Sequence, residues 1–256
     1  MTSIVITGAS SGIGHALALL YAGKGVVLGL QGRDATRLEE VARQCRDKGA
    51  TVELLIADVR DRAACDSWLA DFDRRHPADL LIASAGINGG TRPGSAIESA
   101  EESLTQIETN VVGLLNTVHP LLPGMMARAR GQIALLSSLA GLIPLPDSPS
   151  YCASKFAVRA YGLALRQTLR AHGVKVNVIC PGYVSTPMSR RMTGAKPFEM
   201  SAGEAARRIA RGLQRNTAVI AFPFWFALLS RVGGMLPDPV RRYALQPFRF
   251  NVKDAE

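Results

Sequence analysis

Residues 4–14 read IVITGASSGIG, and this stretch decides the fold. An apolar, β-branched run at 4–7 passes directly into a glycine-rich turn, and a helix-length segment follows. Glycines at such a junction allow a tight turn and let a ligand approach the backbone closely. The start of the next helix offers free N–H groups and the positive end of a dipole, which together bind phosphate. The stretch predicts a strand, a helix and a pyrophosphate-binding turn between them, made by Gly8, Ser10, Ser11, Gly12, Ile13 and Gly14.

Short apolar runs alternate with helix-length segments along the rest of the chain. The runs are apolar almost throughout, which is typical of strands covered on both faces. We place the strands at 3–7, 26–31, 52–57, 79–83, 132–137, 175–180 and 217–221, and the helices around 13–23, 34–49, 61–76, 98–129, 150–172 and 201–215. This alternation predicts an α/β fold, a doubly wound Rossmann-type parallel sheet of seven strands in a single domain. Ligands of such sheets bind beyond the carboxyl ends of the strands, so we expect functional residues there.

Length and composition narrow the classes of function. A chain of 256 residues with 47% hydrophobic and 20% charged residues suits one globular domain. The formal net charge is +9, but the basic residues are spread along the chain, whereas nucleic-acid binding needs them gathered on one face. We therefore expect no nucleic-acid partner and read the charge as an attraction for an anionic cofactor.

The cysteines and the N-terminal residues carry no sign of metal binding or export. Four cysteines and four histidines are scattered without metal-ligand spacing, so no metal site is predicted. The first residues, MTSIVITGAS, have no basic segment and too short an apolar run for a signal peptide. A cytoplasmic location is the expectation.

The end of the second predicted strand bears on the choice of cofactor. Sites for NAD place an acidic residue there for the ribose 2′-hydroxyl, whereas an arginine accommodates the 2′-phosphate of NADP. Here Gly32 takes the acidic position and Arg33 follows. We therefore favour NADP(H) over NAD(H). The alternative is that Arg33 is a solvated loop residue, and Asp34 caps the next helix in either case. Because the glycine turn has no second basic residue, the preference need not be strict.

Tyr151 and Lys155 stand four positions apart, on one face of a predicted helix. A phenol with an ordinary pKa near 10 is a poor base at neutral pH. An ammonium about 4 Å away contributes roughly 4 kcal/mol at an effective dielectric near 20, which lowers a tyrosine pKa by about three units. The pair therefore predicts an acid/base tyrosine, although an isolated Tyr-x-x-x-Lys pattern is common by chance.

Further motifs accompany this pair in a fixed order. They are TGASSGIG at 7–14, N-x-x-G at 110–113, SSLAG at 137–141, YCASK at 151–155 and PGYVST at 181–186. In order and approximate spacing they resemble the main, roughly 250-residue branch of the short-chain dehydrogenase/reductase family, up to about Phe222. One departure stands at 83–86, where Ala-Ser-Ala-Gly replaces the usual Asn-Asn-Ala-Gly and removes side-chain hydrogen bonds of about 1 kcal/mol each.

The resemblance implies a role for each matching residue. Tyr151 would be the acid/base, Lys155 would lower its pKa and bind the nicotinamide ribose, Ser138 would orient the substrate oxygen, and Asn110 would support a proton relay. For the cofactor, Gly8, Gly12 and Gly14 would hold the pyrophosphate, Asp58 and Val59 the adenine, and Val184 and Thr186 the carboxamide, with Ala85, Gly86, Pro181 and Gly182 completing the site.

The activity that the resemblance implies is hydride transfer between nicotinamide and the carbonyl or secondary alcohol carbon of a small-molecule substrate. The apolar residues Leu142, Ile143, Leu145, Met188, Met192, Phe198 and Met200 predict an apolar pocket, or else belong to the core. A homodimer or homotetramer is expected. A non-catalytic NADP-binding sensor and a sugar-modifying reductase remain as alternatives.

The last part of the chain resembles the family least. We divide the chain into a dinucleotide-binding and catalytic domain at 1–222 and an apolar and basic extension at 223–256, packed on the same domain. Residues 218–236 approach the length of a membrane span, but Pro223 divides them, which leaves a short apolar helix at 224–236. Basic residues follow, namely Arg241, Arg242, Arg249 and Lys253. We expect this segment to close the substrate pocket and cover a subunit contact; peripheral contact with an anionic membrane is the alternative.

Overall fold

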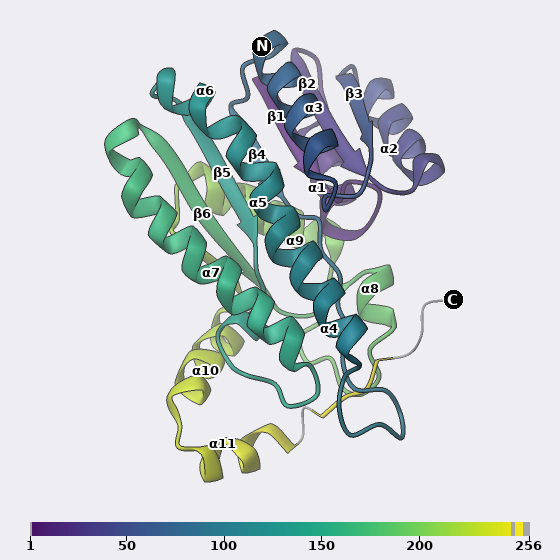
Figure 1. The fold of residues 1–256 in the computed structure, drawn as a ribbon, viewed down its shortest axis with the longest axis vertical. Helices are drawn as coiled ribbons and strands as arrows, with labels where there is room; N and C mark the ends of the chain where they lie inside the picture. Colours follow the sequence, from purple (N-terminus) through teal and green to yellow (C-terminus); the bar gives the residue numbers. More distant parts are fainter. Residues whose placement is uncertain (1, 247–248, 253–256) are drawn as a thin grey trace.

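Seven parallel strands form one sheet in the computed structural model, which describes residues 2–246 and 249–252 (Figure 1). The strands lie in the order β3-β2-β1-β4-β5-β6-β9. Their bounds are Thr2–Thr7 (β1), Val26–Gly32 (β2), Thr51–Ile56 (β3), Leu80–Ala83 (β4), Gly131–Leu136 (β5), Val174–Pro181 (β6) and Val219–Phe222 (β9). The predicted doubly wound sheet and single domain are confirmed. The strand order reverses beside β1, so the chain leaves the neighbouring ends of β1 and β4 toward opposite faces of the sheet, and a crevice opens above them.

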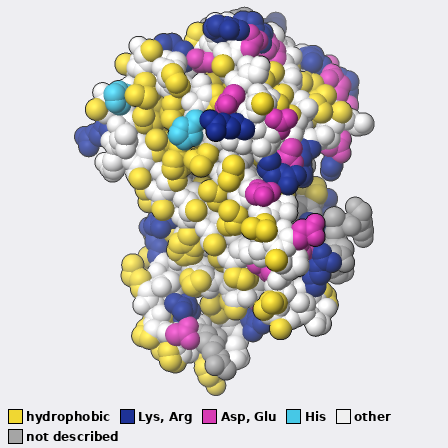
Figure 2. Space-filling view, in the orientation of Figure 1, with side chains coloured by type: hydrophobic (Ala, Val, Ile, Leu, Met, Phe, Trp, Pro, Cys, Tyr) yellow, Lys and Arg dark blue, Asp and Glu magenta, His cyan; other side chains and the backbone are white. Residues whose placement is uncertain are grey.

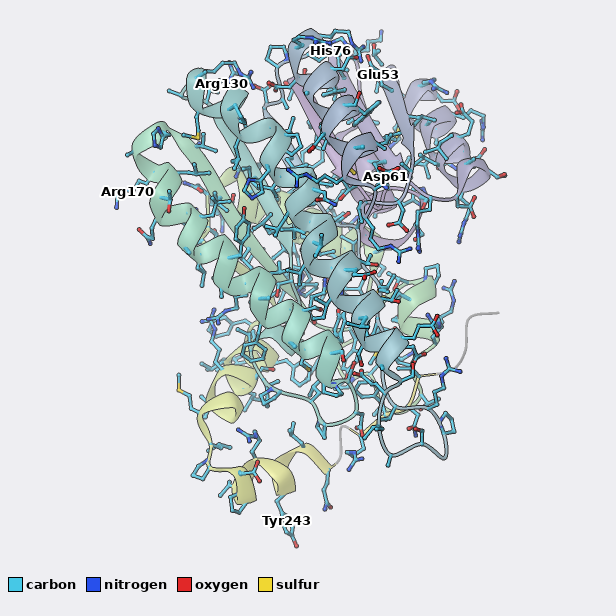
Figure 3. The ribbon with its side chains drawn as sticks, in the orientation of Figure 1. Glu53, Asp61, His76, Arg130, Arg170 and Tyr243 are labelled. Carbon is cyan, nitrogen blue, oxygen red and sulfur yellow. The ribbon has the colours of Figure 1, made fainter. Side chains whose placement is uncertain are left out.

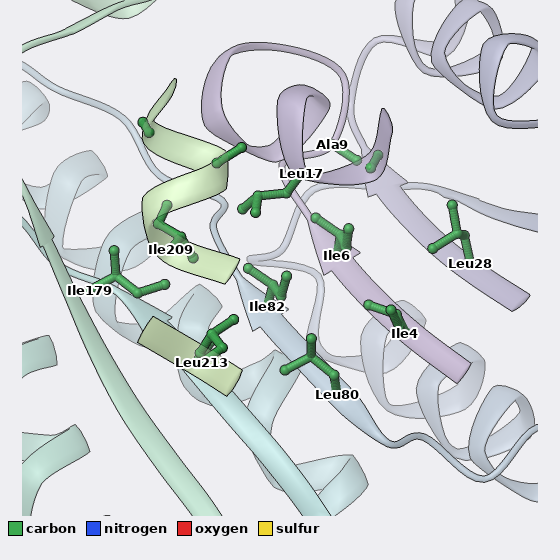
Figure 4. Close-up of a cluster of buried hydrophobic side chains, with 14 of the residues drawn as sticks. Ile4, Ile6, Ala9, Leu17, Leu28, Leu80, Ile82, Ile179, Ile209 and Leu213 are labelled. Atoms are coloured by element: carbon green, nitrogen blue, oxygen red, sulfur yellow. The ribbon is translucent and has the colours of Figure 1, made fainter. Parts of the chain in front are cut away.

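Helices cover both faces of the sheet, which explains the apolar strands. Ile4 and Ile6 of β1 face one way, toward the core beneath α1, α2 and α9, while Val5 faces the core beneath α3, α5 and α7. Figure 4 shows the first of these cores, where Leu17 and Ile209 meet the strands. The helices are Gly12–Tyr21 (α1), Ala35–Asp47 (α2), Arg62–Arg75 (α3), Ala100–Ile107 (α4), Gly113–Val118 (α5), Leu122–Ala127 (α6), Pro149–Leu169 (α7), Pro187–Arg190 (α8), Ala202–Gln214 (α9), Phe224–Met235 (α10) and Asp238–Leu245 (α11).

The predicted helix at 98–129 is not continuous. Five residues of π-helix, Glu108–Val112, separate α4 from α5, and a 3₁₀ turn at His119–Leu121 separates α5 from α6. The prediction of one regular helix over this range is therefore wrong. A π turn inserts an extra residue into the helix and rotates the side chains around it, an arrangement found mostly at functional sites. Here it contains Asn110.

The C-terminal segment forms two helices, α10 and α11, at the end of the molecule opposite the N-terminus (Figure 1). α10 is the short apolar helix expected at 224–236, and its Ala227 packs with Leu139, Leu142 and Cys180. Among residues 2–246 and 249–252, no helix is long and apolar enough to cross a membrane. Lys253 lies outside the described residues.

Candidate active site

A cleft of about 560 Å³ runs along the carboxyl ends of the strands, where the sequence placed the functional residues. It brings together every predicted site residue except one. Its walls include Gly8, Ser10, Ser11, Gly12, Ile13, Gly14, Arg33, Asp58, Val59, Ala85, Gly86, Ser138, Tyr151, Lys155, Pro181, Gly182, Val184 and Thr186. Asn110 does not line the cleft and lies behind its wall.

The glycine turn leaves no room for side chains. Gly8 has φ of +64°, a conformation that favours glycine, and a Cβ there would lie 2.8 Å from the Ala85 Cα. A Cβ on Gly14 would lie 2.4 Å from the Gly8 carbonyl oxygen. The turn is held by Gln31, whose side-chain oxygen accepts a hydrogen bond from the Gly8 N–H at 3.1 Å while its amide donates to the Ala57 carbonyl at 2.5 Å. The role of Gln31 was not predicted from the sequence, because it depends on contacts between the end of β2 and the residues that follow β1 and β3.

Ser84 restores part of the hydrogen bonding that the missing asparagines were expected to remove. Its hydroxyl donates to the Thr7 carbonyl, and the backbone N–H groups of Ser84 and Ala85 both donate to Thr7 Oγ1 at 3.2 Å. The ends of β1 and β4 are therefore tied together here. Ser84 thus supplies hydrogen bonds at a position where we expected a loss of them.

The end of the cleft beside β2 and β3 carries the charged side chains. Arg60 and Arg33 flank Asp58, at 3.0 Å and 3.4 Å from Oδ2. Burial pushes the pKa of Asp58 up, but the hydrogen bonds of Arg60 and the charges of Arg60 and Arg33 outweigh it and hold the pKa below its ordinary value. Arg37, which sequence reasoning missed, also lines this end. Asp34 caps α2 as expected, accepting a hydrogen bond from the Arg37 N–H at 2.9 Å.

Tyr151, Lys155 and Ser138 meet at the centre of the cleft. Tyr151 and Lys155 lie one turn apart on α7, while Ser138 follows β5 and forms a hydrogen bond with Tyr151. The Lys155 ammonium donates to the Leu136 carbonyl at 3.0 Å and lies 5.5 Å from the centre of the Tyr151 ring. A phenol, a hydroxyl and an ammonium thus share one small volume, as proton transfer to a bound oxygen requires.

The two pKa shifts oppose the expectation from the sequence. Burial raises the pKa of Tyr151 to about 12, although the hydrogen bond with Ser138 acts in the other direction. Burial also lowers the pKa of Lys155 to about 8. The expected lowering of the Tyr151 pKa is therefore wrong for the cofactor-free chain, because burial is the largest cause acting on the phenol and raises its pKa.

Asn110 braces the site from behind. Its side-chain oxygen accepts from the Ile87 N–H at 2.8 Å, and its amide donates to the Ile87 carbonyl and to Ser154 Oγ at 2.9 Å and 3.0 Å. The π turn thereby joins the loop after β4 to α7. A Cβ on Gly86 would lie 3.0 Å from the Asn110 side-chain oxygen and 3.4 Å from Lys155 Nζ, so these two side chains approach each other behind this glycine.

The segment after β6 closes the other side of the turn. Val184–Ser185 (β7) pairs with Met200–Ser201 (β8), a small two-stranded sheet that the sequence did not predict. Thr186 caps α8, because its hydroxyl accepts a hydrogen bond from the Ser189 N–H at 3.1 Å. A Cβ added to Gly12 would lie 3.1 Å from the Thr186 methyl group, so Thr186 packs closely against the glycine turn. The Gly182 N–H donates to the Phe222 carbonyl at 2.8 Å. This side of the cleft is therefore fixed to β9.

The remaining end of the cleft is apolar. Four of the predicted apolar residues line it, whereas Leu142 and Met200 are buried and Phe198 is exposed beside Phe226. The C-terminal segment, which we expected to close the substrate pocket, contributes lining residues from α10, from α11 and from the chain that follows them. The apolar lining of this end is Ile143, Leu145, Tyr183, Met188, Met192, Phe226, Leu229, Val232, Leu236, Leu245 and Phe250, and the polar residues Asn88, Ser189 and Ser230 also line the cleft. Among the described lining residues, the charged ones are confined to Lys155 and to the end beside β2 and β3.

Comparisons with known proteins agree with this geometry. The sequence model of the family described as short chain dehydrogenase matches residues 2–196. An uncharacterized oxidoreductase of Myxococcus xanthus is 33% identical over 237 residues, covering 92% of this chain and 93% of the relative. Sulfoacetaldehyde reductase 2 of Chromohalobacter salexigens is 33% identical over 213 residues, covering 82% of each chain. A short-chain dehydrogenase from Sphingobium yanoikuyae, solved in complex with NADPH, has a TM-score of 0.78 at 26% identity and covers 100% of this chain and 99% of its own.

Proposed function

The chain belongs to the short-chain dehydrogenase/reductase family of oxidoreductases, and from this premise we propose that it is an NADP(H)-dependent carbonyl reductase. The observation that carries the proposal is the meeting of Tyr151, Lys155 and Ser138 in the same cleft as the glycine turn. One end of that cleft suits a dinucleotide and the other an apolar substrate, with the acid/base group between them.

The residues of the turn fit a dinucleotide. Where side chains would fill the space at Gly8 and Gly14, a pyrophosphate can instead approach the start of α1. Arg33 and Arg37 would bind the 2′-phosphate, and both are exposed at the end beside β2 and β3. The similar Sphingobium yanoikuyae protein was solved with NADPH, which supports this choice. When bound, the nicotinamide supplies or accepts the hydride.

Tyr151 acts as the proton donor. Because its pKa is raised to about 12, the phenol is protonated at neutral pH, which suits donation to a carbonyl oxygen. Ser138 donates a hydrogen bond to the same oxygen and keeps it at the phenol. Lys155 stabilises the phenolate left behind, and Asn110 holds α7 in register through Ser154. These roles describe reduction, and oxidation of an alcohol would use the same groups in reverse.

The substrate is a neutral, apolar ketone or aldehyde of small to medium size. An anionic substrate would need a charged partner, and the described lining of the substrate end provides none. The similarity to a sulfoacetaldehyde reductase at 33% identity therefore does not extend to an anionic substrate here.

We also propose that the protein self-associates as a homodimer or homotetramer in the cytoplasm. Two separate apolar faces are exposed. Hydrophobic side chains gather over α4, α5 and α7 (Figure 2), including Leu104, Val112 and Phe156, and a second set lies on α10. One face would support a dimer and both would support a tetramer. The four cysteines are free thiols, as expected in a reducing compartment.

Tyr151→Phe tests the function. Removing only the hydroxyl should lower turnover of NADPH with a panel of apolar ketones by at least about 10²-fold, because the principal acid is lost. NADPH binding, followed by its fluorescence, should stay near the wild-type value. Activity above about one per cent of wild type would exclude Tyr151 as the acid. Wild-type protein that binds NADPH but reduces no member of the panel would instead favour the non-catalytic sensor.

A further inference from the structure

We propose that residues 249–252, here called the C-terminal strap, form one wall of the substrate site and set the size of substrate that the cleft accepts. This inference rests on the proposed function, because it names the selectivity of that same site. The strap is joined to three loops that surround the substrate end of the cleft. Each connection is made between residues that lie far apart in the sequence.

The first connection is a buried carboxylate. The side chain of Asp147 is only 4% exposed, and its two oxygens lie 2.7 Å and 2.9 Å from Arg249 Nε. The backbone N–H of Phe250 donates to the same carboxylate at 3.1 Å. Asp147 therefore fixes both the start of the strap and the direction in which it runs. A buried carboxylate with two such partners is stable where an unpaired one would not be.

The second connection joins the strap to the flap at 188–200. Asn251 and Thr193 are joined by two hydrogen bonds. The Thr193 N–H donates to the Asn251 carbonyl at 2.8 Å, and the Asn251 N–H donates to the Thr193 side chain, Oγ1, at 2.9 Å. Met192 and Val252 form an antiparallel bridge beside them. The strap thus holds the flap by a short stretch of strand-like pairing.

The third connection is close packing against the loop after β4. The Val252 N–H donates to the Thr91 carbonyl at 3.1 Å. A Cβ on Gly90 would lie 2.9 Å from Val252 Cγ2 and 3.6 Å from Phe250 Cε2, so the strap occupies the space that this glycine leaves. The strap therefore bridges the loop after β4 to the flap.

Phe250 is the strap residue that reaches the cleft. Its side chain is 6% exposed and lines the substrate end together with Leu145, Met188 and Met192. The Phe250 backbone is held by Asp147, and its buried ring packs beside Gly90, so the ring lies at a fixed part of the cleft wall. We infer that Phe250 limits the size of the group attached to the reacting carbonyl.

Phe250→Ala tests this wall directly. The control is Tyr243→Ala, which removes an aromatic side chain that is 79% exposed and points away from the molecule at α11 (Figure 3). For NADPH-dependent reduction, kcat/KM is compared between a two-ring aromatic ketone and a short linear ketone. Phe250→Ala should raise the ratio in favour of the bulky ketone by about tenfold, and Tyr243→Ala should leave it unchanged. An unchanged ratio in Phe250→Ala overturns the inference.

A second measurement does not depend on catalysis. Removing 249–256 deletes the acceptor of the Thr193 N–H, so hydrogen–deuterium exchange across 188–194 should quicken by about tenfold or more. Arg249→Ala, which keeps the chain length, should give a smaller increase in the same segment, and Tyr243→Ala none. Unchanged exchange in both strap variants overturns the strap as a brace of the flap. If wild-type protein reduces no ketone, the proposed function fails, and the exchange result still decides the strap.

Discussion

The ammonium of Lys155 lies 5.5 Å from the centre of the Tyr151 ring, yet its hydrogen bond goes to the Leu136 carbonyl. Burial moves the pKa of these neighbours in opposite directions, toward about 8 for Lys155 and about 12 for Tyr151. Each shift favours the neutral form, as desolvation always does. The two groups therefore make stability depend on alkaline pH in opposite ways.

Lys155→Met should remove one part of that dependence. Between pH 8 and 10.5 the unfolded chain binds the lysine proton more fully than the folded chain, so this residue makes stability rise with pH in that window. Tyr151 acts oppositely between 10 and 12, where the folded chain holds the proton more firmly. The measurement is the urea midpoint of cofactor-free protein from pH 7 to 11.

The difference in midpoint between wild type and variant reports Lys155 and its neighbours. Burial raises the pKa of the Cys45, Cys65 and Cys152 thiols to about 11, which lowers the stability of both proteins alike above pH 9. The Cys180 thiol has the same raised pKa, but its charge interacts with that of Lys155, so its contribution differs between the two proteins above pH 9. The wild-type midpoint minus the variant midpoint should rise from pH 8 to 10.5. Lys175→Met, at an exposed position on β6, is the matched control. A flat difference would contradict a lowered Lys155 pKa.

Arg33→Asp should shift the cofactor preference from NADP(H) toward NAD(H). The substitution removes a charge-assisted phosphate contact and supplies an acceptor for the ribose hydroxyl, so the ratio of kcat/KM values should change by about tenfold or more. Arg37→Ala should change it in the same direction but less. Arg43→Ala, paired with Glu40 on the exposed face of α2, serves as the control. A ratio that does not move in Arg33→Asp would show that the clamp lies elsewhere.

Gly14→Ala should disrupt the phosphate turn. The added methyl group would meet the Gly8 carbonyl oxygen at 2.4 Å and Ser84 Oγ at 2.8 Å, which should cost about 1–3 kcal/mol of stability and weaken NADPH binding at least tenfold. Gly23→Ala meets nothing within 4 Å and should be close to neutral. Thermal unfolding and NADPH titration report the two effects. Equal behaviour of the two variants would argue against a tight turn.

The exposed face of α10 should contribute to a subunit contact. Trp225 and Met235 are 71% and 86% exposed. The double variant Trp225→Lys, Met235→Lys should have a lower particle mass than the wild type, as measured by light scattering. Leu20→Lys, at an exposed position on α1, should leave the mass unchanged. Unchanged mass in the α10 variant, together with flotation of wild-type protein on anionic liposomes, would favour the membrane surface instead.

Local patterns predicted most of the sheet and the centre of the site. All seven strands lie within two or three residues of their expected bounds, because each is a β-branched or aliphatic run flanked by turn residues. The glycine turn and the spacing of Tyr151 and Lys155 are equally local. They predicted a cleft beyond the carboxyl ends of the strands, and the structure has it there, because all parallel strands end at the same edge of the sheet.

Features that depend on distant contacts were not predictable. The π turn at 108–112 is a slip of one backbone hydrogen bond and has no residue type of its own, so 98–129 reads as an ordinary helix. Asp147 and Arg249 are separated by 102 positions, and each is unremarkable in its own segment. The direction of the Tyr151 pKa shift was missed for the same reason, because desolvation depends on the packing of the whole cleft.

The strap joins loops that lie beyond the strand ends to the end of α11, where the Arg249 N–H donates to the Gln246 carbonyl at 3.3 Å. None of its four residues belongs to the three clusters that hold helices to sheet, so a change there leaves those clusters intact, provided that Arg249 remains to pair with the buried Asp147. A combinatorial library confined to 250–252 and 188–194 should therefore yield clones of varied substrate range with the sheet and its helices unchanged. The substrate range of this fold can therefore change through its loops while the sheet and the helices that cover it stay the same.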